Sequence, residues 1–229
     1  MRFGLDVPAG TEPVLDAEHD RYEWVDQAEA LRRCQPAAVA DGVAIAAAAL
    51  AAPVSFRPLT EPDLPALVAW HAAPHVARWF REPLDLDAAR RKYGPRIAGQ
   101  SATRVHVIMV AGQDAGFAQH YRVGDYPAYA TATGLPAAAG LDYAIGRPEL
   151  TGHGLGPQVI WAYVRDVVRS AHPAATQALA SPEIGNLRSV RALAKAGFVR
   201  SAEISVDGEP APEQLCVLDL TRFFGERGR

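Results

Sequence analysis

The spacing of apolar and polar residues changes near residue 53 and predicts two parts of the chain. Before that point only short elements are expected: Asp26 and Glu29 form a capping box at the start of one helix, and residues 37–52 form a second helical run. These elements are too few to bury a core of their own. We therefore expect an N-terminal extension at 1–53 and one larger domain at 54–229.

From residue 54 onward, strand patterns and helical patterns follow one another. Apolar residues two apart predict strands, and apolar residues three and four apart predict helices. The expected strands are 54–59, 104–110, 116–121, 140–145, 176–180, 199–206 and 214–220. The expected helices begin after Thr60, near His75, at about residue 85, at Pro157 and at Asn186, and 124–139 is interpreted as a long loop. This mixture predicts an α/β (α+β) domain.

Composition and charge exclude several classes of protein. The chain is 49% apolar and 21% charged, which is typical of a globular protein, and 23 basic against 26 acidic residues leave a net charge of −3. Such a weak charge gives no electrostatic footprint for nucleic acid or an anionic membrane. Cys34 and Cys216 are too few for a disulfide scaffold or a zinc site. The N-terminus lacks the apolar core of a signal peptide, so a cytoplasmic protein is expected.

A glycine cluster, Gly152-His153-Gly154-Leu155-Gly156, separates a predicted strand from a predicted helix. Free backbone N–H groups and the helix dipole make such a turn a phosphate site. A Walker loop is excluded because Pro157 and Gln158 follow the last glycine. A dinucleotide fingerprint has different glycine spacing and an acidic residue on the next strand. A pyrophosphate loop for coenzyme A and a glycine-rich helix start without a ligand remain open.

The order of elements around that cluster resembles the GNAT acetyltransferase superfamily from about residue 54 to residue 224. The most specific segment is the run from Asn186 to Phe198, which ends in Lys-Ala-Gly-Phe. Within the superfamily the chain is most similar to aminoglycoside 6'-N-acetyltransferases and to relatives that acylate siderophore precursors. The segments that carry this closer similarity are 56–64, 77–80, 116–121 and 140–142. The resemblance implies a mixed central sheet in which one parallel strand pair splays apart, flanked by helices.

The resemblance also implies acetyl-coenzyme A as cosubstrate, with no metal. Its pantetheine arm would pair with the backbone of Tyr143, Ala144 and Ile145, and a backbone N–H near Ile145 would polarise the thioester carbonyl. Asn186 would hydrogen-bond the pantetheine or its neighbourhood. The pyrophosphate would reach the backbone of the helix start, formed by Gly152, His153, Gly154, Leu155, Gly156, Pro157 and Gln158.

Acetyl transfer to an amine requires a proton acceptor, because alkyl amines are mostly protonated at neutral pH. The resemblance implies that Asp142 is this general base and also binds the acceptor; its alternative role is to solvate a strand end. Asp125 matches a second substrate-binding aspartate, and a turn-forming role is an equal alternative. Trp79 would stack on a sugar ring or lie in the core. Tyr121 is assigned to the acceptor site as well.

Three positions depart from the family pattern. Ser181 stands where relatives place a further acidic ligand, and Thr151 replaces the usual Gln or Arg before the first glycine. Leu193 occupies the position at which many members carry a tyrosine that protonates the departing thiolate. The tyrosines that could substitute for it are Tyr121, Tyr143 and Tyr163.

The histidines suggest no metal site. His71 and His75 are four residues apart, but Pro74 interrupts the helix that would align them. His106 and His120 lie on the two strands of one predicted hairpin, where a pair on one strand face is the simpler interpretation.

The leading segment carries a second resemblance. Residues 13–50, with Glu18–Val25 as the most similar stretch, resemble the C-terminal end of a Nudix hydrolase. The Nudix box, which binds the metal in that family, is absent from this segment. We therefore expect no diphosphate hydrolysis.

These observations lead to one expected function with stated alternatives. The chain is expected to acetylate a primary amine of a small polar molecule, an aminoglycoside 6'-amine first, by direct transfer within a ternary complex. The alternatives are a siderophore precursor or peptide amine as acceptor, or a non-catalytic coenzyme A-binding regulator suggested by Thr151 and Leu193. An acidic acceptor cleft would favour the polycationic sugar. The sequence predicts no oligomeric state.

Overall fold

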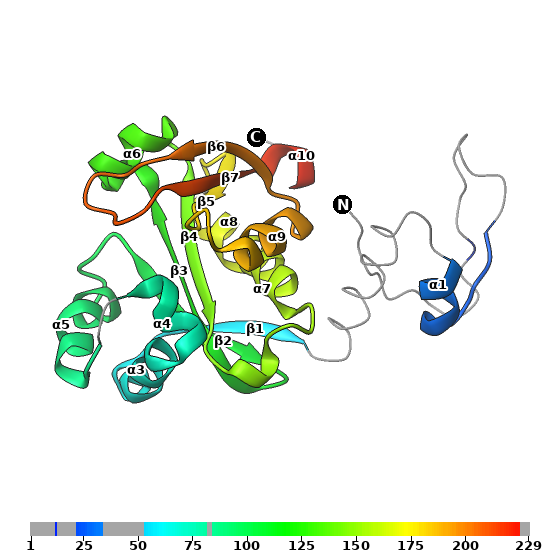
Figure 1. Ribbon diagram of the computed structural model, residues 1–229, viewed down its shortest axis with the longest axis horizontal. Helices are drawn as coiled ribbons and strands as arrows, with labels where there is room; N and C mark the ends of the chain where they lie inside the picture. Colours follow the sequence, from blue (N-terminus) through cyan, green and yellow to red (C-terminus); the bar gives the residue numbers. More distant parts are fainter. Residues whose placement is uncertain (1–11, 13–21, 34–52, 82–83, 225–229) are drawn as a thin grey trace. The chain divides into compact units, whose positions relative to one another are not determined.

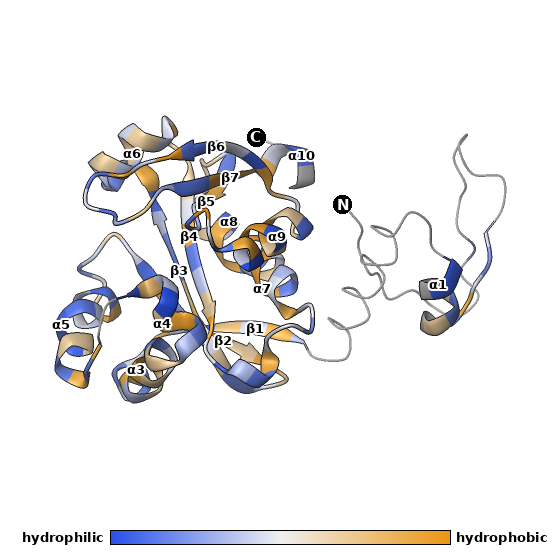
Figure 2. Cartoon of the chain, in the orientation of Figure 1, coloured by the Kyte–Doolittle hydropathy of each residue, from blue (hydrophilic) through white to orange (hydrophobic). Residues whose placement is uncertain are grey.

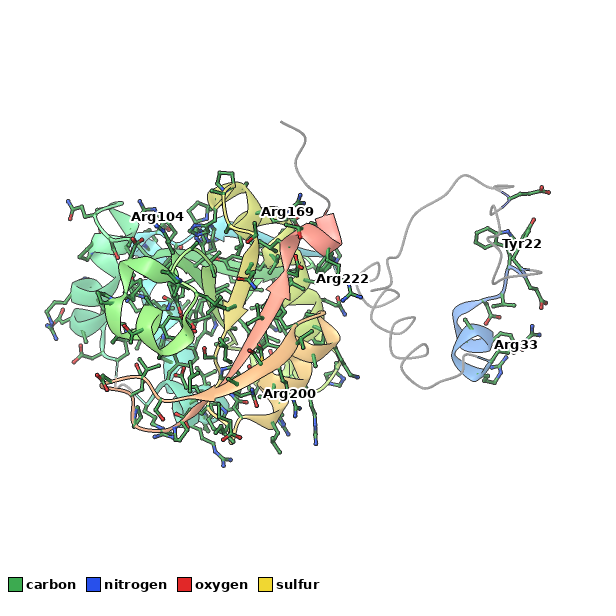
Figure 3. The ribbon with its side chains drawn as sticks, turned by 90° about the horizontal axis from the view of Figure 1, so that it is seen from above. Tyr22, Arg33, Arg104, Arg169, Arg200 and Arg222 are labelled. Atoms are coloured by element: carbon green, nitrogen blue, oxygen red, sulfur yellow. The ribbon has the colours of Figure 1, made fainter. Side chains whose placement is uncertain are left out.

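The computed structural model describes residues 12, 22–33, 53–81 and 84–224, and the chain divides into two units, Met1–Ala51 and Ala52–Arg229. In the first unit, helix α1 (Gln27–Arg33) begins with the expected cap, because the Glu29 N–H donates to Asp26 Oδ1 at 2.8 Å. Tyr22 and Arg33 project from this segment in Figure 3. The helical run expected at 37–52 and most of the Nudix-like segment lie outside the described residues.

The second unit is built on a seven-stranded mixed sheet in the order β1-β2-β3-β4-β5-β7-β6 (Figure 1). All neighbouring strands are antiparallel except β4 and β5, which are parallel. The predicted mixed sheet with one parallel pair is therefore confirmed. The strands are β1 (Val54–Pro58), β2 (Arg104–Val110), β3 (Gln113–Arg122), β4 (Ala139–Ile145), β5 (Gln177–Ala180), β6 (Val199–Ile204) and β7 (Glu213–Asp219).

Helices cover both faces of the sheet. The α-helices of this unit are α3 (Leu64–Ala72), α4 (Pro74–Phe80), α5 (Leu86–Ile97), α6 (Pro127–Thr133), α7 (Leu155–Tyr163), α8 (Arg169–Ala171), α9 (Leu187–Lys195) and α10 (Leu220–Phe224). Between them are short 3₁₀ turns and one π turn: η1 (Glu61–Asp63), η2 (Val123–Asp125), η3 (Pro148–Leu150) and η4 (Val164–Val168). None of the helices among the described residues is both long and apolar enough to cross a membrane.

Strand alternation assigns each face of the sheet its own core. On one face, Phe117 packs with Leu67 of α3 and Tyr93 of α5. On the other face, Leu141 packs with residues of α7, and Leu193 of α9 joins the same cluster. Helix α9 carries both hydrophobic and hydrophilic residues (Figure 2), and its buried Leu193 belongs to the same cluster as Val159 and Ile160 of α7. This amphipathic arrangement fixes the two helices that flank the strand pair on which the site depends.

The parallel pair of strands parts after two residues. β4 and β5 are paired only at Ala139–Ala178 and Gly140–Leu179, although β4 continues to Ile145. The last residues of β4 therefore have no neighbour on the β5 side in the sheet. This confirms the splayed parallel pair expected from the sequence.

Three elements differ from the sequence expectation. Helix α7 begins at Leu155 and not at Pro157, because Gly154 adopts the left-handed φ of 78° at its N-cap; Pro157 falls within the first turn, where an N–H lacks a helical partner anyway. The expected loop 124–139 contains helix α6, whose seven residues are too few to show a helical period. Helix α10 follows β7 directly, and Asp219 Oδ1 accepts from the Thr221 N–H at 2.9 Å.

Candidate active site

Asp142 lies at the end of a hydrogen-bonded chain that joins three elements. It is a half-buried residue of β4, opposite Gln119 of β3. Gln119 Nε2 donates to Asp142 Oδ2 at 2.7 Å, and Gln119 Oε1 accepts from Arg96 Nη1 of α5 at 2.7 Å. The carboxylate is thus held by a neutral donor on one oxygen, with no ion pair of its own among the described residues.

The surroundings of Asp142 raise its pKa above the ordinary value. Burial is the largest cause, and the charge of Glu209 adds to it. The hydrogen bond from Gln119 and the positive charges of Arg96 and Lys92 act in the opposite direction. A carboxyl group whose pKa is shifted toward neutrality is better matched to accepting a proton from an ammonium group.

A second carboxylate, Glu213, lies in the same region and has no local sequence signature. Burial raises its pKa to about 8, and the charges of Glu209, Asp142 and Glu183 contribute further. The start of β7 is held against the loop that follows β5, since the Gln214 N–H donates to Pro182 O at 2.8 Å. This non-local pairing brings the hairpin residues near Asp142, so no spacing in the sequence could have revealed them.

Glu213 and Glu183 differ in their partners. Glu183 forms an ion pair with Arg81, at the end of α4, with 2.5 Å between Nη2 and Oε2. The Glu213 side chain has no hydrogen bond or salt bridge to another described residue, although its backbone pairs with Ile204 and Glu183, and three carboxylates act on its pKa. The region is therefore acidic, with an unmatched negative charge when these groups are ionised.

Two tyrosines, Tyr121 and Tyr129, interact with both Asp142 and Glu213. The Tyr129 hydroxyl of α6 is hydrogen-bonded to Ser181 Oγ, and both Asp142 and Glu213 act on its pKa, which burial raises. Tyr121 is buried and lies over Gly140: a Cβ there would meet its Cε2 at 2.3 Å, so only glycine fits. Tyr121, assigned to the acceptor site, therefore packs on Gly140 and interacts with Asp142 and Tyr129.

Trp79 and Asp125 occupy different places. Trp79 of α4 is half-buried; its indole lies 3.8 Å from the position of a Cβ on Gly185, with the Arg78 guanidinium 4.9 Å from the ring centre. The structure therefore places Trp79 against the loop that precedes α9. Asp125 is exposed in η2, and the group on which its charge acts is His172, not Asp142. The structure does not bring Asp125 together with the proposed base.

The end of β4 presents backbone groups to the space that β5 leaves. The Gly146 N–H donates to Ala115 O of β3 at 2.8 Å, and the Ala144 carbonyl points toward Gly116 of the same strand. Because backbone groups alternate in direction along a strand, Tyr143 and Ile145 turn theirs toward the β5 side. The Ile145 carbonyl accepts from His75 Nε2 at 2.8 Å. Of the three residues expected to bind pantetheine, Tyr143 and Ile145 therefore turn their backbone groups toward the β5 side, whereas those of Ala144 face β3.

The glycine loop leads into the first turn of α7. Gly152 and Gly154 both adopt positive φ, 85° and 78°, and these two residues and His153 between them are exposed. Leu155 and Gly156 supply N–H groups of the first helical turn, whereas Pro157 has none to offer. Gly156 has a further reason to be glycine, since a Cβ there would lie 3.3 Å from the Ala192 Cβ of α9.

Two polar side chains lie beside this loop. Gln158 is buried, its Nε2 is 3.5 Å from Gly154 O, and its Oε1 has no hydrogen-bond partner among the described residues. A buried polar atom without a partner fits a ligand bound at the start of α7. Asn186 has a structural role, because its Oδ1 accepts from the Ser189 N–H at 3.2 Å and caps α9.

Histidines and carboxylates give no metal centre in the part of the chain that the structure describes: no group of three or more such ligands is placed to hold an ion. His106 and His120 form the expected strand-face pair, with ring centres 5.5 Å apart.

Comparison with known proteins agrees with this geometry. The family model described as an acetyltransferase (GNAT) domain matches residues 60–206. Aminoglycoside N(6')-acetyltransferase type 1 from Klebsiella pneumoniae is 28% identical over 163 residues, which are 69% of this chain and 80% of that protein, and the protein of that name from Serratia marcescens matches equally.

Solved structures give the same result. Aminoglycoside acetyltransferase AAC(6')-Ib in complex with coenzyme A and kanamycin has a TM-score of 0.68 and 26% identity, covering 76% of this chain and 99% of the other. Spermidine N-acetyltransferase from Vibrio cholerae, at 16% identity and a TM-score of 0.56, covering 74% of this chain and 97% of the other, shares the fold alone. Since the family model extends over more than half of the 229 residues, the chain belongs to the GNAT acetyltransferases.

Proposed function

We propose that the protein transfers an acetyl group from acetyl-coenzyme A to a primary amine of a small polycationic molecule, with an aminoglycoside 6'-amine as the first candidate. The observation that carries this proposal is the group of carboxylates that interact with Asp142, among which the Glu213 side chain has no hydrogen bond or salt bridge to another described residue. An acidic cleft attracts an acceptor with several ammonium groups more strongly than an amine with a single charge. Relatives crystallised with kanamycin and ribostamycin support the same acceptor class.

The cosubstrate would be held by the end of β4 and by the start of α7. The backbone groups of Tyr143 and Ile145 face the space between the parted strands, where they can pair with an amide-bearing arm. The N–H groups of Leu155 and Gly156 and the exposed turn before them suit a pyrophosphate, and Gln158 supplies an unpaired polar atom beside it.

In the proposed reaction, Asp142 accepts a proton from the bound ammonium, directly or through a water molecule. The freed amine then attacks the thioester carbonyl carbon, and the Ile145 N–H stabilises the negative charge that develops on its oxygen. Acetyl-coenzyme A supplies the acetyl group. The C–N bond forms as the C–S bond breaks, and the departing thiolate takes up the proton that the nitrogen loses as it becomes an amide. Direct transfer of this kind needs no covalent enzyme intermediate.

A non-catalytic coenzyme A-binding regulator is the second candidate function. The observation that favours it is Leu193, which is fully buried and offers no proton where many relatives carry a tyrosine. A siderophore precursor or peptide amine as acceptor is a third possibility, and the acidic surroundings of Asp142 argue against it. We also propose that residues 1–53 are an extension that takes no part in acetyl transfer.

A thiol-release assay with acetyl-coenzyme A tests the proposal against aminoglycosides, polyamines and lysine derivatives. We expect the highest kcat/KM with an aminoglycoside that has a free 6'-amine, and NMR of the product should place the acetyl group on that nitrogen. The matched acceptor with a 6'-hydroxyl in place of the amine should not react. Calorimetry that shows coenzyme A binding, together with no turnover on any amine, would support the regulator instead.

A further inference from the structure

We propose that Arg96 is a positioning residue, which acts through Gln119 to keep Asp142 Oδ2 occupied and Oδ1 free to take the proton. The inference rests on the proposed acetyl transfer. It is drawn from three residues that lie on three separate elements, α5, β3 and β4. Arg96 Nη1 donates to Gln119 Oε1, and Gln119 Nε2 donates to Asp142 Oδ2, both at 2.7 Å.

The role of Arg96 follows from the two ends of the Gln119 amide. One end is a donor and the other an acceptor, so the amide can in principle present either to Asp142. A guanidinium group can only donate, and it therefore requires the amide oxygen. With Oε1 turned to Arg96, the NH₂ group must face the carboxylate. Without Arg96 the amide is free to turn, which would place its oxygen against the carboxylate oxygens.

Arg96 is itself held by the buried core of the same face. Its guanidinium lies 5.1 Å from the ring centre of Tyr93, one turn earlier on α5. Tyr93 is only 2% exposed, and its hydroxyl lies 3.0 Å from Nε2 of the buried His71 on α3. The position of the proposed base is therefore set from the hydrophobic core and does not depend on a freely moving surface arginine.

The charges around Asp142 give this arrangement a measurable consequence. From α5, Arg96 and Lys92 favour the ionised form, while Glu209 on the turn between β6 and β7 opposes it. The other groups that interact with Asp142 are Tyr121 and Tyr163, Tyr129 of α6 and Glu213 of β7. Loss of the Arg96 charge and of an ordered Gln119 donor should both raise the pKa of Asp142. The rise in reaction rate with pH should then occur at higher pH.

The first measurement requires no turnover. The chemical shift of the Asp142 carboxyl carbon is followed by NMR as a function of pH in the free protein. The signal is assigned to Asp142 because it is missing from the spectrum of Asp142→Asn. Arg96→Met keeps the side-chain stem but removes the donor, and we expect the midpoint to rise by about half to one pH unit. Arg96→Lys, which keeps a donor-only cation, should return it toward the original value. Arg90→Met is the matched control, because Arg90 is an exposed residue of the same helix whose partner is Asp87.

The second measurement is the pH profile of kcat/KM with an acceptor that the enzyme uses. Arg96→Met should shift the ascending limb by the same amount and lower kcat roughly tenfold, with little change in KM for the acceptor. If Arg96 acts through Gln119, the loss of kcat on the high-pH plateau should be the same in the double variant with Gln119→Met as in Gln119→Met alone, because Asp142 is fully ionised there whatever its pKa.

The outcomes separate this proposal from the proposed function. A shifted NMR midpoint in a protein that acetylates nothing would support the positioning of Asp142 and contradict the acetyl transfer. Active enzyme with the same midpoint and pH profile in Arg96→Met as in the parent would overturn the positioning role. If Arg96→Met does not fold, Gln119→Met in the intact background decides, since it should raise the same midpoint while Arg96 stays in place.

Discussion

The hydroxyl of Tyr143 lies 2.8 Å from Ser189 Oγ, so a side chain of β4 reaches the first turn of α9 beyond the point where β4 and β5 part. Leu193 follows one turn later on the same helix and has no proton to give. Burial raises the pKa of Tyr143, which keeps its hydroxyl protonated. Of the three tyrosines considered, Tyr143 is therefore the one that presents a donor between the separated strands and α9.

Replacement of Tyr143 by Phe should lower kcat roughly three- to tenfold, because a departing thiolate would lose a hydrogen-bond donor. The loss should shrink with an acyl donor whose thiol is more acidic, since that thiol leaves without help. Initial rates with two acyl donors of different thiol pKa measure this. Tyr163→Phe is the control: it removes the bond to His106 on the face covered by α7 and should reduce stability but not kcat. Equal losses with both donors would contradict the role of Tyr143.

Replacement of Asp142 by Asn should lower kcat/KM about a hundredfold or more at neutral pH. The carboxylate must be ionised to accept a proton, so the rate of the parent enzyme should rise with pH through the pKa of Asp142, which burial places above its ordinary value. In the variant this ascending limb should be lost. Stopped assays across pH 5–9 measure it. Full activity of Asp142→Asn at every pH would show that another group removes the proton.

Glu213 should make acceptor binding depend on pH. Its pKa is raised to about 8, so the free protein carries it largely protonated at pH 7, and binding of a cation should release that proton. Calorimetry in buffers of different ionisation enthalpy should detect proton release with the parent and less with Glu213→Gln. The acceptor KM should fall as pH rises toward 8, and this change should be weaker in the variant.

Glu203→Gln is the matched control for this prediction, because Glu203 lies on the same hairpin but is exposed. It should leave both the proton release and the pH dependence unchanged. Equal proton release by the parent and Glu213→Gln would contradict the assignment of Glu213 to acceptor binding.

The glycine loop can be tested by backbone strain. Gly154→Ala introduces a Cβ at a φ of 78°, which costs about 1–2 kcal/mol and should displace the first turn of α7. We expect weaker binding of coenzyme A by calorimetry. Gly112→Ala introduces the same strain at a φ of 77° in the turn between β2 and β3. It should reduce stability by a similar amount without changing coenzyme A affinity. Equal losses of affinity in the two variants would contradict the assignment of the glycine loop to coenzyme A binding.

The sequence predicted what depends on local order. Each strand was expected to within a few residues, because side-chain alternation is a property of neighbouring positions, and the glycine cluster marked the start of α7. Helix α6 was missed because its seven residues are too few to show the helical spacing of apolar positions. The carboxylate Glu213 and the arginine Arg96 were missed for another reason. Arg96 reaches Asp142 through a residue 23 positions away, and only the strand register brings them together.

For two expected site residues, Asp125 and Ala144, the sequence indicated the position but could not predict the direction in which the residue faces. Asp125 matched a family position, but the short helical turn η2 leaves it exposed and acting on His172. Ala144 lies between two residues that face the parted strands, and strand alternation turns it toward β3. Residue type and position along the chain therefore suggested these two, while direction in space was decided by the backbone.

One buried histidine, His120, and two half-buried ones, His106 and His172, should make the protein sensitive to acid. His120 Nδ1 lies 2.8 Å from His172 Nε2, and the His106 ring stacks on the His120 ring. Burial, followed by the charges of His172, His106 and Arg104, lowers the pKa of His120 to about 3. The unfolded chain takes up a proton near pH 6.5, where the folded protein does not. Stability is therefore complete above about pH 6.5 and falls as the pH drops toward 3.

Urea unfolding at pH 8 and at pH 5 measures this loss. His120 alone should account for about 2 kcal/mol of the difference. At pH 8 the unfolded histidine is neutral, and pH 5 lies about 1.5 units below its pKa, at about 1.4 kcal/mol per unit. His120→Asn keeps a polar atom near the position of Nδ1 but does not titrate, so the difference between the two pH values should shrink by that amount. His153→Asn, on the exposed loop, should leave the difference unchanged. A His120→Asn protein with the same acid sensitivity as its parent would assign the loss to other groups.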